Sequence, residues 1–268
     1  ISIFSLSFIK KIKLILVDRI DISELKKYYN FSSFIKNYII YLFVKFFYKY
    51  ADAIVSNSKS AKKDLENITN SKVINISPPS LLKLNKIKKR KIKRRKIIIL
   101  TVGSLVKGKG VDTMIKSIKL VNNNVILIVA GEGLHRLSLE NLILKLKLRN
   151  KVKLLGWIKN PEKLYRKADI FIHASHQEGF PNSIVEAINF SLPVIASKCK
   201  GGTSEILLNG AGGDLFAVND HISLAKKINN YLKNPYELNK KLKIARRNII
   251  KYTVDNNFKK YMNIFNKI

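Results

Sequence analysis

The sequence predicts an α/β protein built on parallel, doubly wound sheets and divided into two domains. Short β-branched runs alternate with helical patterns along most of the chain, and repeated βα units with buried strands imply a parallel sheet. The chain has 268 residues, enough for about two domains. Its 46% hydrophobic content, with only 12 Gly and 6 Pro, excludes disordered and collagen-like proteins.

The first predicted domain covers residues 1–85. Its expected elements are strands at 13–17, 53–56 and 72–76, with helices at 33–50 and 59–66. The chain begins at Ile1, inside an apolar run, without an initiator Met or a secretion cleavage pattern. We therefore expect it to be a segment of a longer protein.

The apolar stretch 38–48 lies within the first of these helices. It is shorter than the roughly 20 residues needed to cross a bilayer, so no transmembrane helix is predicted. Its aromatic residues and its basic neighbours Lys36, Lys45 and Lys49 are compatible with a helix lying on an anionic membrane. A core helix of an α/β domain is the favoured interpretation.

Residues 86–96 are predicted to form a basic linker between the domains. Nine of these eleven residues are Lys or Arg, and like charges at that density repel one another and stay solvated. Binding to anionic lipid or nucleic acid is the alternative interpretation of this segment.

The second predicted domain covers residues 97–250, where the alternation becomes regular. Strands are expected at 97–102, 125–130, 152–155, 170–173 and 193–196, and helices at 111–120, 134–148, 161–166, 182–189, 221–232 and 235–250. A C-terminal helix within 251–268 is expected to pack back on the first domain.

Composition limits the classes of partner. The formal net charge of +33 favours anionic partners, which include nucleic acid, anionic lipid and phosphorylated small molecules. The single cysteine, Cys199, excludes a disulfide framework and a cysteine-built zinc site, and four scattered histidines do not suggest a metal site. This cysteine usage fits a reducing compartment, so a cytoplasmic location is expected.

Two loops that follow predicted strands are rich in glycine. Ligands of open parallel sheets bind beyond the carboxyl ends of the strands. After the strand 97–102, Gly103 and Ser104 precede Lys109 and a helix start, an arrangement suited to phosphate but also to a plain turn with a solvated lysine. After the strand 125–130, Gly131 and Gly133 either line a cavity or serve only the turn.

The loop after the strand 170–173 carries the most informative residues. Pro181 and Asn182 suit a helix start, which places Glu178 in the loop and Glu186 about one turn into the helix. Carboxylates accept hydrogen bonds from sugar hydroxyls, while a helix N-terminus and Lys109 favour a diphosphate. The combination indicates a nucleoside diphosphate sugar. Ordinary charge compensation at a helix N-terminus is the alternative explanation for the two glutamates.

Ordered sequence blocks carry a family resemblance. They are VGSLVKGKG (102–110), VAGEG (129–133), LLGWI (154–158), LYRKADIFIHAS (164–175), QEGFPNSIVEA (177–187), LPVIAS (192–197) and GGTSEIL (201–207). Over this half the chain resembles the retaining glycosyltransferases of family four, the group 1 glycosyltransferases, which have the GT-B fold of two Rossmann-like domains. ADAIVSNSKSAKKDL (51–65) resembles the later part of their acceptor domain. The resemblance implies that the N-terminal domain is incomplete and that residues 97–250 bind the nucleotide sugar.

The resemblance also implies roles for individual residues. Glu186 would bind the ribose of the donor, and Glu178 would contact the transferred sugar together with the backbone of Gly179 and Phe180. Lys109 would neutralise the departing diphosphate, which makes Glu178 and Lys109 the expected catalytic pair. The donor-binding set is completed by the following residues: Gly103, Ser104, Asn182 and Ser183.

Other positions have less certain counterparts in the family. The family usually has an Arg where this chain has Ser104, and Lys107 is a candidate substitute for the lost cation. The loop of Gly201, Gly202 and Glu205 would line the donor side, although use as a helix entry is an equal alternative. On the acceptor side the candidates are Asp18, Arg19 and Asp21, while His173 and His176 are interpreted as ordinary partly buried histidines.

The expected activity is hexosyl transfer, with retention of configuration, from a nucleoside diphosphate sugar to an acceptor hydroxyl in bacterial surface polysaccharide or lipid-linked glycan synthesis. The acceptor would be a saccharide or a lipid-linked saccharide, and no metal, other cofactor or nucleic acid is expected. The basic surface suits peripheral contact with the inner face of the cytoplasmic membrane. A catalytically impaired, donor-binding remnant is the alternative.

Overall fold

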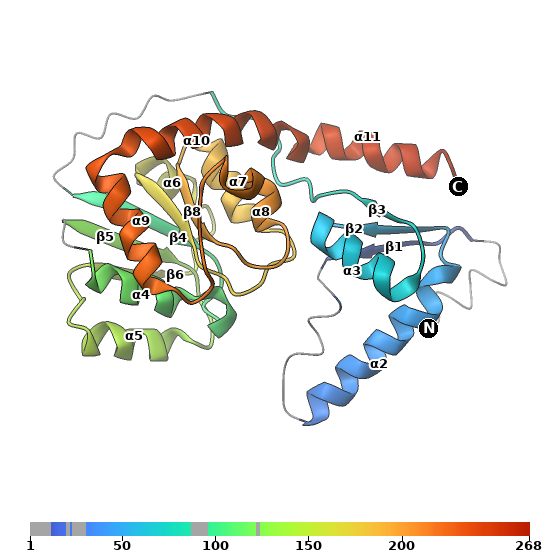
Figure 1. The fold of residues 1–268 in the computed structure, drawn as a ribbon, viewed down its shortest axis with the longest axis horizontal. Helices are drawn as coiled ribbons and strands as arrows, with labels where there is room; N and C mark the ends of the chain where they lie inside the picture. The colour runs from blue at the N-terminus through green and yellow to red at the C-terminus, as the bar shows by residue number, and fades with distance from the viewer. Residues whose placement is uncertain (1–11, 20–21, 23–30, 87–95, 122–123) are drawn as a thin grey trace.

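The computed structural model describes residues 12–19, 22, 31–86, 96–121 and 124–268 and contains two separate sheets (Figure 1). A three-stranded sheet has the order β1-β2-β3, and a six-stranded sheet has the order β6-β5-β4-β7-β8-β9. All of their paired strands are parallel. The α/β fold class with parallel sheets is therefore confirmed.

The small sheet is built from the N-terminal part of the chain. Its elements are β1 (Ile15–Asp18), α2 (Phe31–Phe47), η2 (Tyr48–Tyr50), β2 (Ala53–Ser56), α3 (Lys59–Thr69) and β3 (Val73–Asn75). Ile54 of β2 packs with Leu65 of α3 on one face, while Val55 faces the other way and packs with Ile264 near the C-terminus. This alternation along β2 buries both faces of the sheet.

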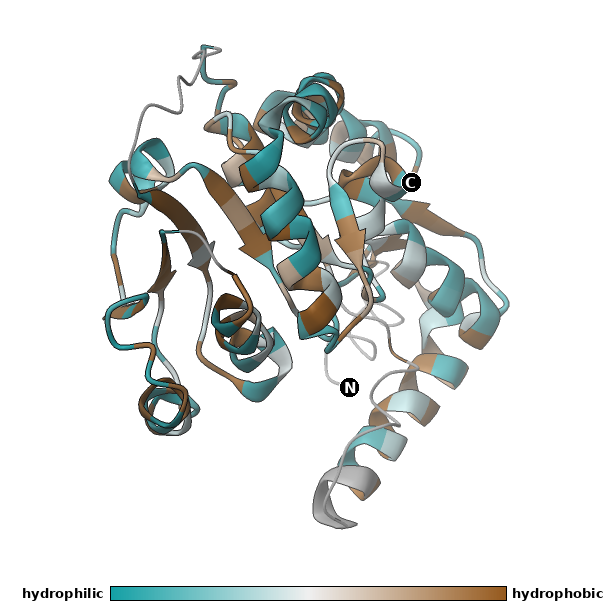
Figure 2. Cartoon of the chain, turned by 60° about the vertical axis from the view of Figure 1, so that its left-hand side comes forward, coloured by the Kyte–Doolittle hydropathy of each residue, from teal (hydrophilic) through white to brown (hydrophobic). Residues whose placement is uncertain are grey.

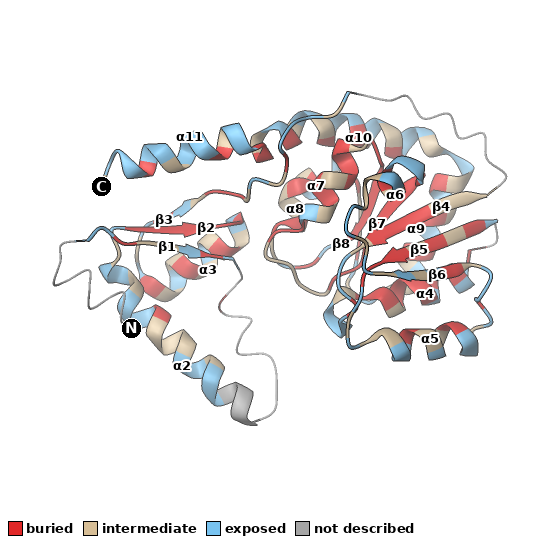
Figure 3. Ribbon diagram, turned by 180° about the vertical axis from the view of Figure 1, so that it is seen from behind, coloured by how far each residue is buried: buried red, intermediate tan, exposed pale blue. Residues whose placement is uncertain are grey.

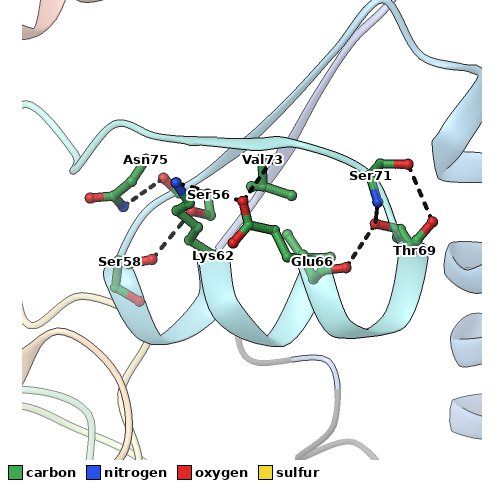
Figure 4. A network of polar contacts seen from close by, with 9 residues as sticks. Ser56, Ser58, Lys62, Glu66, Thr69, Ser71, Val73 and Asn75 are labelled. Carbon is green, nitrogen blue, oxygen red and sulfur yellow. Dashed lines mark hydrogen bonds and ion pairs between the residues drawn. The ribbon is translucent and has the colours of Figure 1, made fainter.

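Polar contacts fix the turn from β2 into α3 (Figure 4). The hydroxyl of Ser58 caps the helix by accepting from the backbone N–H of Ala61 at 3.2 Å. Near the other end, Glu66 accepts from the backbone N–H of Val73 at 3.2 Å and ties α3 to β3. The strand-to-helix turn that carries Asn57 is thereby held against the sheet.

The large sheet carries helices on both faces. Its elements are β4 (Ile97–Val102), η3 (Lys107–Lys109), α4 (Val111–Lys119), β5 (Val125–Ala130), α5 (Arg136–Lys145), β6 (Val152–Gly156), α6 (Glu162–Lys167), β7 (Ile170–His173), α7 (Asn182–Asn189), β8 (Val194–Ser197), α8 (Thr203–Ile206), η4 (Leu208–Gly210), β9 (Asp214–Phe216), α9 (His221–Lys233) and α10 (Pro235–Asn248). Ile99 of β4 packs toward α4 and α9, whereas the adjacent Leu100 packs toward α6 and α7. The central strands are accordingly apolar and buried (Figures 2 and 3).

The chain passes between the two sheets twice, and we call these two segments the crossings. One follows β3, and the other runs from α10 through η5 (Ile249–Tyr252) into α11 (Val254–Phe265), which lies along the small sheet (Figure 1). The backbone N–H of Leu81 donates to Tyr252 O at 3.2 Å, and that of Val254 donates to Leu81 O at 2.9 Å. The two crossings therefore pair with each other. Residues 87–95 of the expected linker lie outside the described residues.

Arg246 of α10 ties the first crossing to α7. Its Nη1 donates to the carbonyls of Ile188 and Asn189, at 2.9 and 2.8 Å, and its Nη2 donates to Asn85 O at 2.7 Å. The side chain of Asn189 adds a bond from the backbone N–H of Asn85 at 2.9 Å. Since α7 also carries three predicted site residues, Asn182, Ser183 and Glu186, this junction positions the site.

Replacing Arg246 by alanine is expected to lower the free energy of unfolding by roughly 2 kcal/mol, because several partly buried carbonyls lose a charged donor. Urea unfolding measures the change. Arg247→Ala is the matched control, since Arg247 is exposed, and it should cost less than about 0.5 kcal/mol. Equal losses in the two variants would contradict the positioning role.

Candidate functional site

The candidate site lies where the strand order of the large sheet reverses, between β4 and β7. Such a switch point is the usual ligand position in an open parallel sheet. A pocket of about 320 Å³ opens there. It is lined by Thr101, Val102, Gly103, Ser104, Lys109, Met114, His173, Ser175, Glu178, Phe180, Pro181, Asn182, Ser183 and Glu186. The structure thus gathers the expected donor-binding residues around one pocket, with the exception of Gly179.

The first loop reaches the site through a close backbone approach. Gly110 has φ +61°, and a Cβ there would lie 2.1 Å from the carbonyl oxygen of Ala174, so only glycine fits this left-handed position. The backbone N–H of His176 donates to Gly108 O at 2.8 Å. These contacts hold Lys109 beside the loop that follows β7. Lys107 is exposed and does not line the pocket.

Glu178 is held by donors that converge on one of its oxygens. Its Oε1 accepts from Lys109 Nζ at 2.5 Å and from Ser175 Oγ at 2.7 Å, and His173 Nε2 lies 3.2 Å away. Among the described residues, no hydrogen bond involves Oε2. Glu178 therefore offers one carboxylate oxygen to a ligand hydroxyl while the other orients the side chain.

Electrostatics keep Glu178 ionised. Its side chain is only 12% exposed, and burial alone would raise its pKa. The contacts of His173 and Lys109 outweigh that penalty and lower the pKa of Glu178 to about 2. His173, which the sequence suggested was an ordinary histidine, lies in the pocket beside this carboxylate.

This pKa predicts a dependence of stability on pH. An acid whose pKa falls from 4.5 to about 2 on folding stabilises the folded state above pH 4.5, and that contribution disappears as pH falls toward 2. Between pH 5 and pH 3 the wild type should lose about 2 kcal/mol more unfolding free energy than Glu178→Gln. Urea unfolding at both values measures this difference, and identical losses would contradict the assigned environment.

Glu186 faces the pocket from α7. The helix buries Ile184, Val185 and Ile188 in the core and leaves Glu186 half-buried on its other side. Glu186 Oε2 accepts from the hydroxyl of Tyr165 at 2.8 Å, and the Tyr165 ring is fully buried. Burial raises the pKa of Glu186, and the hydrogen bond from Tyr165 opposes the rise. The hydrogen bond to the buried Tyr165 side chain thus fixes the position of the Glu186 carboxylate in the pocket.

The second glycine pair supports the site from beneath. A Cβ on Gly131 would lie 1.8 Å from Gly103 O, and one on Gly133 would lie 2.5 Å from Leu105 O. Neither glycine lines the pocket. The two glycines therefore serve the turn and do not line the cavity, because their backbone packs directly against the first loop.

The loop of Gly201, Gly202 and Glu205 also has a structural role, because it packs against the site loop. A Cβ on Gly201 would overlap the carbonyl oxygen of Glu178, and the backbone N–H of Gly202 donates to Gly179 O at 3.0 Å. Glu205 Oε2 accepts from the backbone N–H of Lys59 at 3.0 Å, at the start of α3. These residues do not line the donor pocket and instead join the site loop to the small sheet.

A second cleft, of about 490 Å³, lies between the small sheet and the site loop. Gly179 lines it, and Glu178 lines both cleft and pocket. Arg19 O accepts from Asn57 Nδ2 at 2.7 Å, and a Cβ on Gly179 would lie 1.9 Å from the same oxygen. Asp18 is buried at the end of β1, and Asp21 lies outside the described residues. The acceptor-side candidate Arg19 thus abuts Gly179 and lines the same cleft as Glu178.

The described residues contain no group of three His, Cys, Asp or Glu side chains arranged to hold a metal ion. Within the same part of the chain, no helix is both long enough and apolar enough to span a bilayer.

Solved structures place this fold among the GT-B glycosyltransferases. The structure of Anabaena HepE in complex with UDP-glucose superposes with a TM-score of 0.82, at 19% identity, covering 99% of this chain and 75% of that chain. TarM superposes with a TM-score of 0.81 at 22% identity, covering 96% of this chain and 51% of that chain. At these identities the likeness establishes the fold.

The family follows from sequence. The family model described as glycosyl transferases group 1 matches residues 83–249, which is more than half of the chain. The chain therefore belongs to the group 1 glycosyltransferase family, and the resemblance seen in the sequence is confirmed.

Two curated relatives illustrate the extent of the match. An uncharacterised glycosyltransferase of Methanocaldococcus jannaschii is 35% identical over 63% of this chain and 45% of its own length. The N-acetylgalactosamine-N,N'-diacetylbacillosaminyl-diphospho-undecaprenol 4-alpha-N-acetylgalactosaminyltransferase of Campylobacter jejuni is 30% identical over 76% of this chain and 56% of its own length. The chain thus spans about half the length of these relatives.

Proposed function

We propose that this chain carries the donor side of a retaining glycosyltransferase, which transfers a hexosyl group from a nucleoside diphosphate sugar to an acceptor hydroxyl. The observation that carries the proposal is the convergence of Lys109, Glu178 and Glu186 on one pocket at the sheet's switch point. A cation between two hydroxyl-accepting carboxylates matches a diphosphate with a sugar ring at either end.

In this arrangement the ribose lies at Glu186, the diphosphate at Lys109 and the transferred sugar at Glu178. Negative charge grows on the diphosphate as the glycosidic bond breaks, and Lys109 and the start of α7 are already in place to stabilise it. Because the side chain at position 104 is a serine, Lys109 is the one Lys or Arg among the described residues lining the pocket. We therefore assign it the main share of leaving-group stabilisation.

The acceptor enters from the second cleft, which shares Glu178, Phe180 and Asn182 with the donor pocket. Its hydroxyl oxygen bonds to the anomeric carbon on the face from which the diphosphate departs, and its proton passes to the departing diphosphate, so configuration is retained. The mechanism calls for no metal, other cofactor or nucleic acid. Names of relatives support a glycan pathway: the Campylobacter jejuni enzyme is named for a diphospho-undecaprenol acceptor, and a Staphylococcus aureus relative for capsular polysaccharide biosynthesis. A lipid-linked saccharide acceptor is the form we favour.

Helix α2 supports peripheral membrane contact. Val44 is buried against the small sheet, while Ile39 and Phe46 are more than half exposed beside Lys36 and Lys45. The helix thus combines a core face with an apolar and basic outer face, which suits the surface of an anionic leaflet. This placement would bring the enzyme to a lipid-linked acceptor at the inner face of the cytoplasmic membrane.

Thermal unfolding with a panel of nucleotide sugars tests the proposal. A ligand at 100 times its dissociation constant should add about 2.7 kcal/mol of stability. We expect one nucleotide class to stabilise the chain, and the free nucleoside diphosphate to retain part of the effect. Absence of stabilisation by every nucleotide sugar would contradict a donor site.

A donor-binding unit without transferase activity is the second candidate, because every residue that lines the donor pocket comes from the part of the chain that builds the large sheet. Release of the nucleoside diphosphate from a stabilising donor separates the candidates. Turnover supports the transferase, whereas binding without turnover supports the donor-binding unit.

A further inference from the structure

A third cavity, of about 600 Å³, forms a groove between β2, β3 and α11, on the small sheet. Its apolar floor comes from the following residues: Ala53, Ile54, Ile74, Ile76, Ile264 and Ile268. Ile76 and Ile264 are buried, but Ile74 at the edge strand is 36% exposed. The groove therefore offers uncovered apolar surface in a concave setting, as sites for apolar ligands do.

The rim of this groove is basic. Lys72, Lys260 and Lys267 line it, and all three are exposed. None of them forms an ion pair with another described residue. The single acid of the lining, Asp52, is already bound by Lys13 and by the backbone N–H of Leu14. The rim thus has uncompensated positive charge for an anionic group.

The groove adjoins the cleft assigned to the acceptor. Ile76 lines both of them. On α11, Tyr261 lines the cleft while its neighbour Lys260 lines the groove. The cleft and the groove are therefore adjacent along α11.

We propose that this groove binds the lipid portion of a lipid-diphosphate-linked saccharide acceptor, with the apolar chain on the isoleucine floor and the diphosphate at the lysine rim. The inference rests on the proposed transferase function and specifies its acceptor. An apolar floor does not stabilise a free saccharide, because the sugar hydroxyls would find no hydrogen-bond partners there. The basic rim favours an anionic amphiphile over a neutral lipid. The saccharide would then lie in the cleft and the lipid diphosphate in the adjacent groove.

Binding of farnesyl diphosphate, a short isoprenoid diphosphate, tests the assignment by calorimetry on the whole chain. We expect measurable binding to the wild type and much weaker binding of inorganic pyrophosphate, since pyrophosphate lacks the apolar contact. Lys260→Glu combined with Lys267→Glu should weaken farnesyl diphosphate about tenfold or more. Ile74→Ser should weaken it several-fold and leave pyrophosphate unchanged.

Lys226→Glu combined with Lys243→Glu is the matched control. Both residues are exposed, lie on α9 and α10, and carry the same change of charge outside the groove. The control should bind farnesyl diphosphate within twofold of the wild type. Equal weakening in the two double variants, equal affinity for pyrophosphate, or no binding of farnesyl diphosphate would overturn the groove assignment. Stabilisation by nucleotide sugars is measured in a separate experiment. If no nucleotide sugar stabilised the chain, the transferase proposal would fail, but binding of farnesyl diphosphate would still show whether the groove holds a lipid diphosphate.

Discussion

Replacing Lys109 by alanine is expected to lower kcat for donor turnover by about 100- to 1,000-fold, the effect of removing one preorganised group that stabilises developing negative charge. The full effect is expected because Ser104 supplies no second cation to the pocket. Lys109 also donates to Glu178 at 2.5 Å, so its removal disturbs the carboxylate as well. Release of nucleoside diphosphate from the donor measures the loss.

Lys107→Ala is the matched control for this variant. Lys107 lies in the same short helix, is exposed and does not line the pocket. It should retain kcat within about threefold, as expected for a solvated side chain. If the two variants lost activity equally, the effect would reflect net charge or loop folding and the role assigned to Lys109 would fail.

Replacing Glu186 by alanine is expected to weaken donor binding by about 10- to 100-fold. A half-buried carboxylate that accepts from ribose hydroxyls contributes roughly 1.5–3 kcal/mol. Calorimetry with the stabilising nucleotide sugar measures the affinity. Glu186→Gln keeps one acceptor oxygen and should fall between the wild type and the alanine variant.

The Glu186 variants also lose the contact with Tyr165, which bonds Glu186 at 2.8 Å. Tyr165→Phe removes that contact and leaves the carboxylate free to bind ribose. This control should weaken the donor less than about fivefold while lowering stability by about 1 kcal/mol. A donor affinity that falls as far in Tyr165→Phe as in Glu186→Ala would mean that the glutamate acts only through packing.

The sequence predicted the large sheet because its strands are buried on both faces. The run Val125–Ala130 is wholly apolar and the run Ile97–Val102 is apolar except for Thr101, and they appear as β5 and β4 with the expected bounds. The strand β9 was missed, since three residues, Asp214–Phe216, give no recognisable periodicity. The short helix α8 begins at Thr203, directly after Gly202, so the helix entry that the sequence offered as the equal alternative for this loop is present.

The sequence also indicated which loops form the site, because parallel strands end at the same edge of a sheet. It could not show what each glycine packs against. Gly131 and Gly201 abut other loops rather than the pocket, and this depends on packing between segments distant in the chain. Glu205 likewise bonds the backbone of Lys59, 146 residues away. The sequence did not predict the contact between His173 and Glu178, because this contact depends on how the loop after β7 folds back over the strand.

The position of a bound nucleotide tests the central claim most directly. A crystal structure of the chain with the stabilising nucleoside diphosphate should show diphosphate oxygens about 3 Å from Lys109 Nζ, with ribose hydroxyls at a similar distance from the carboxylate of Glu186. A nucleotide bound elsewhere on the chain, touching neither side chain, would contradict the account.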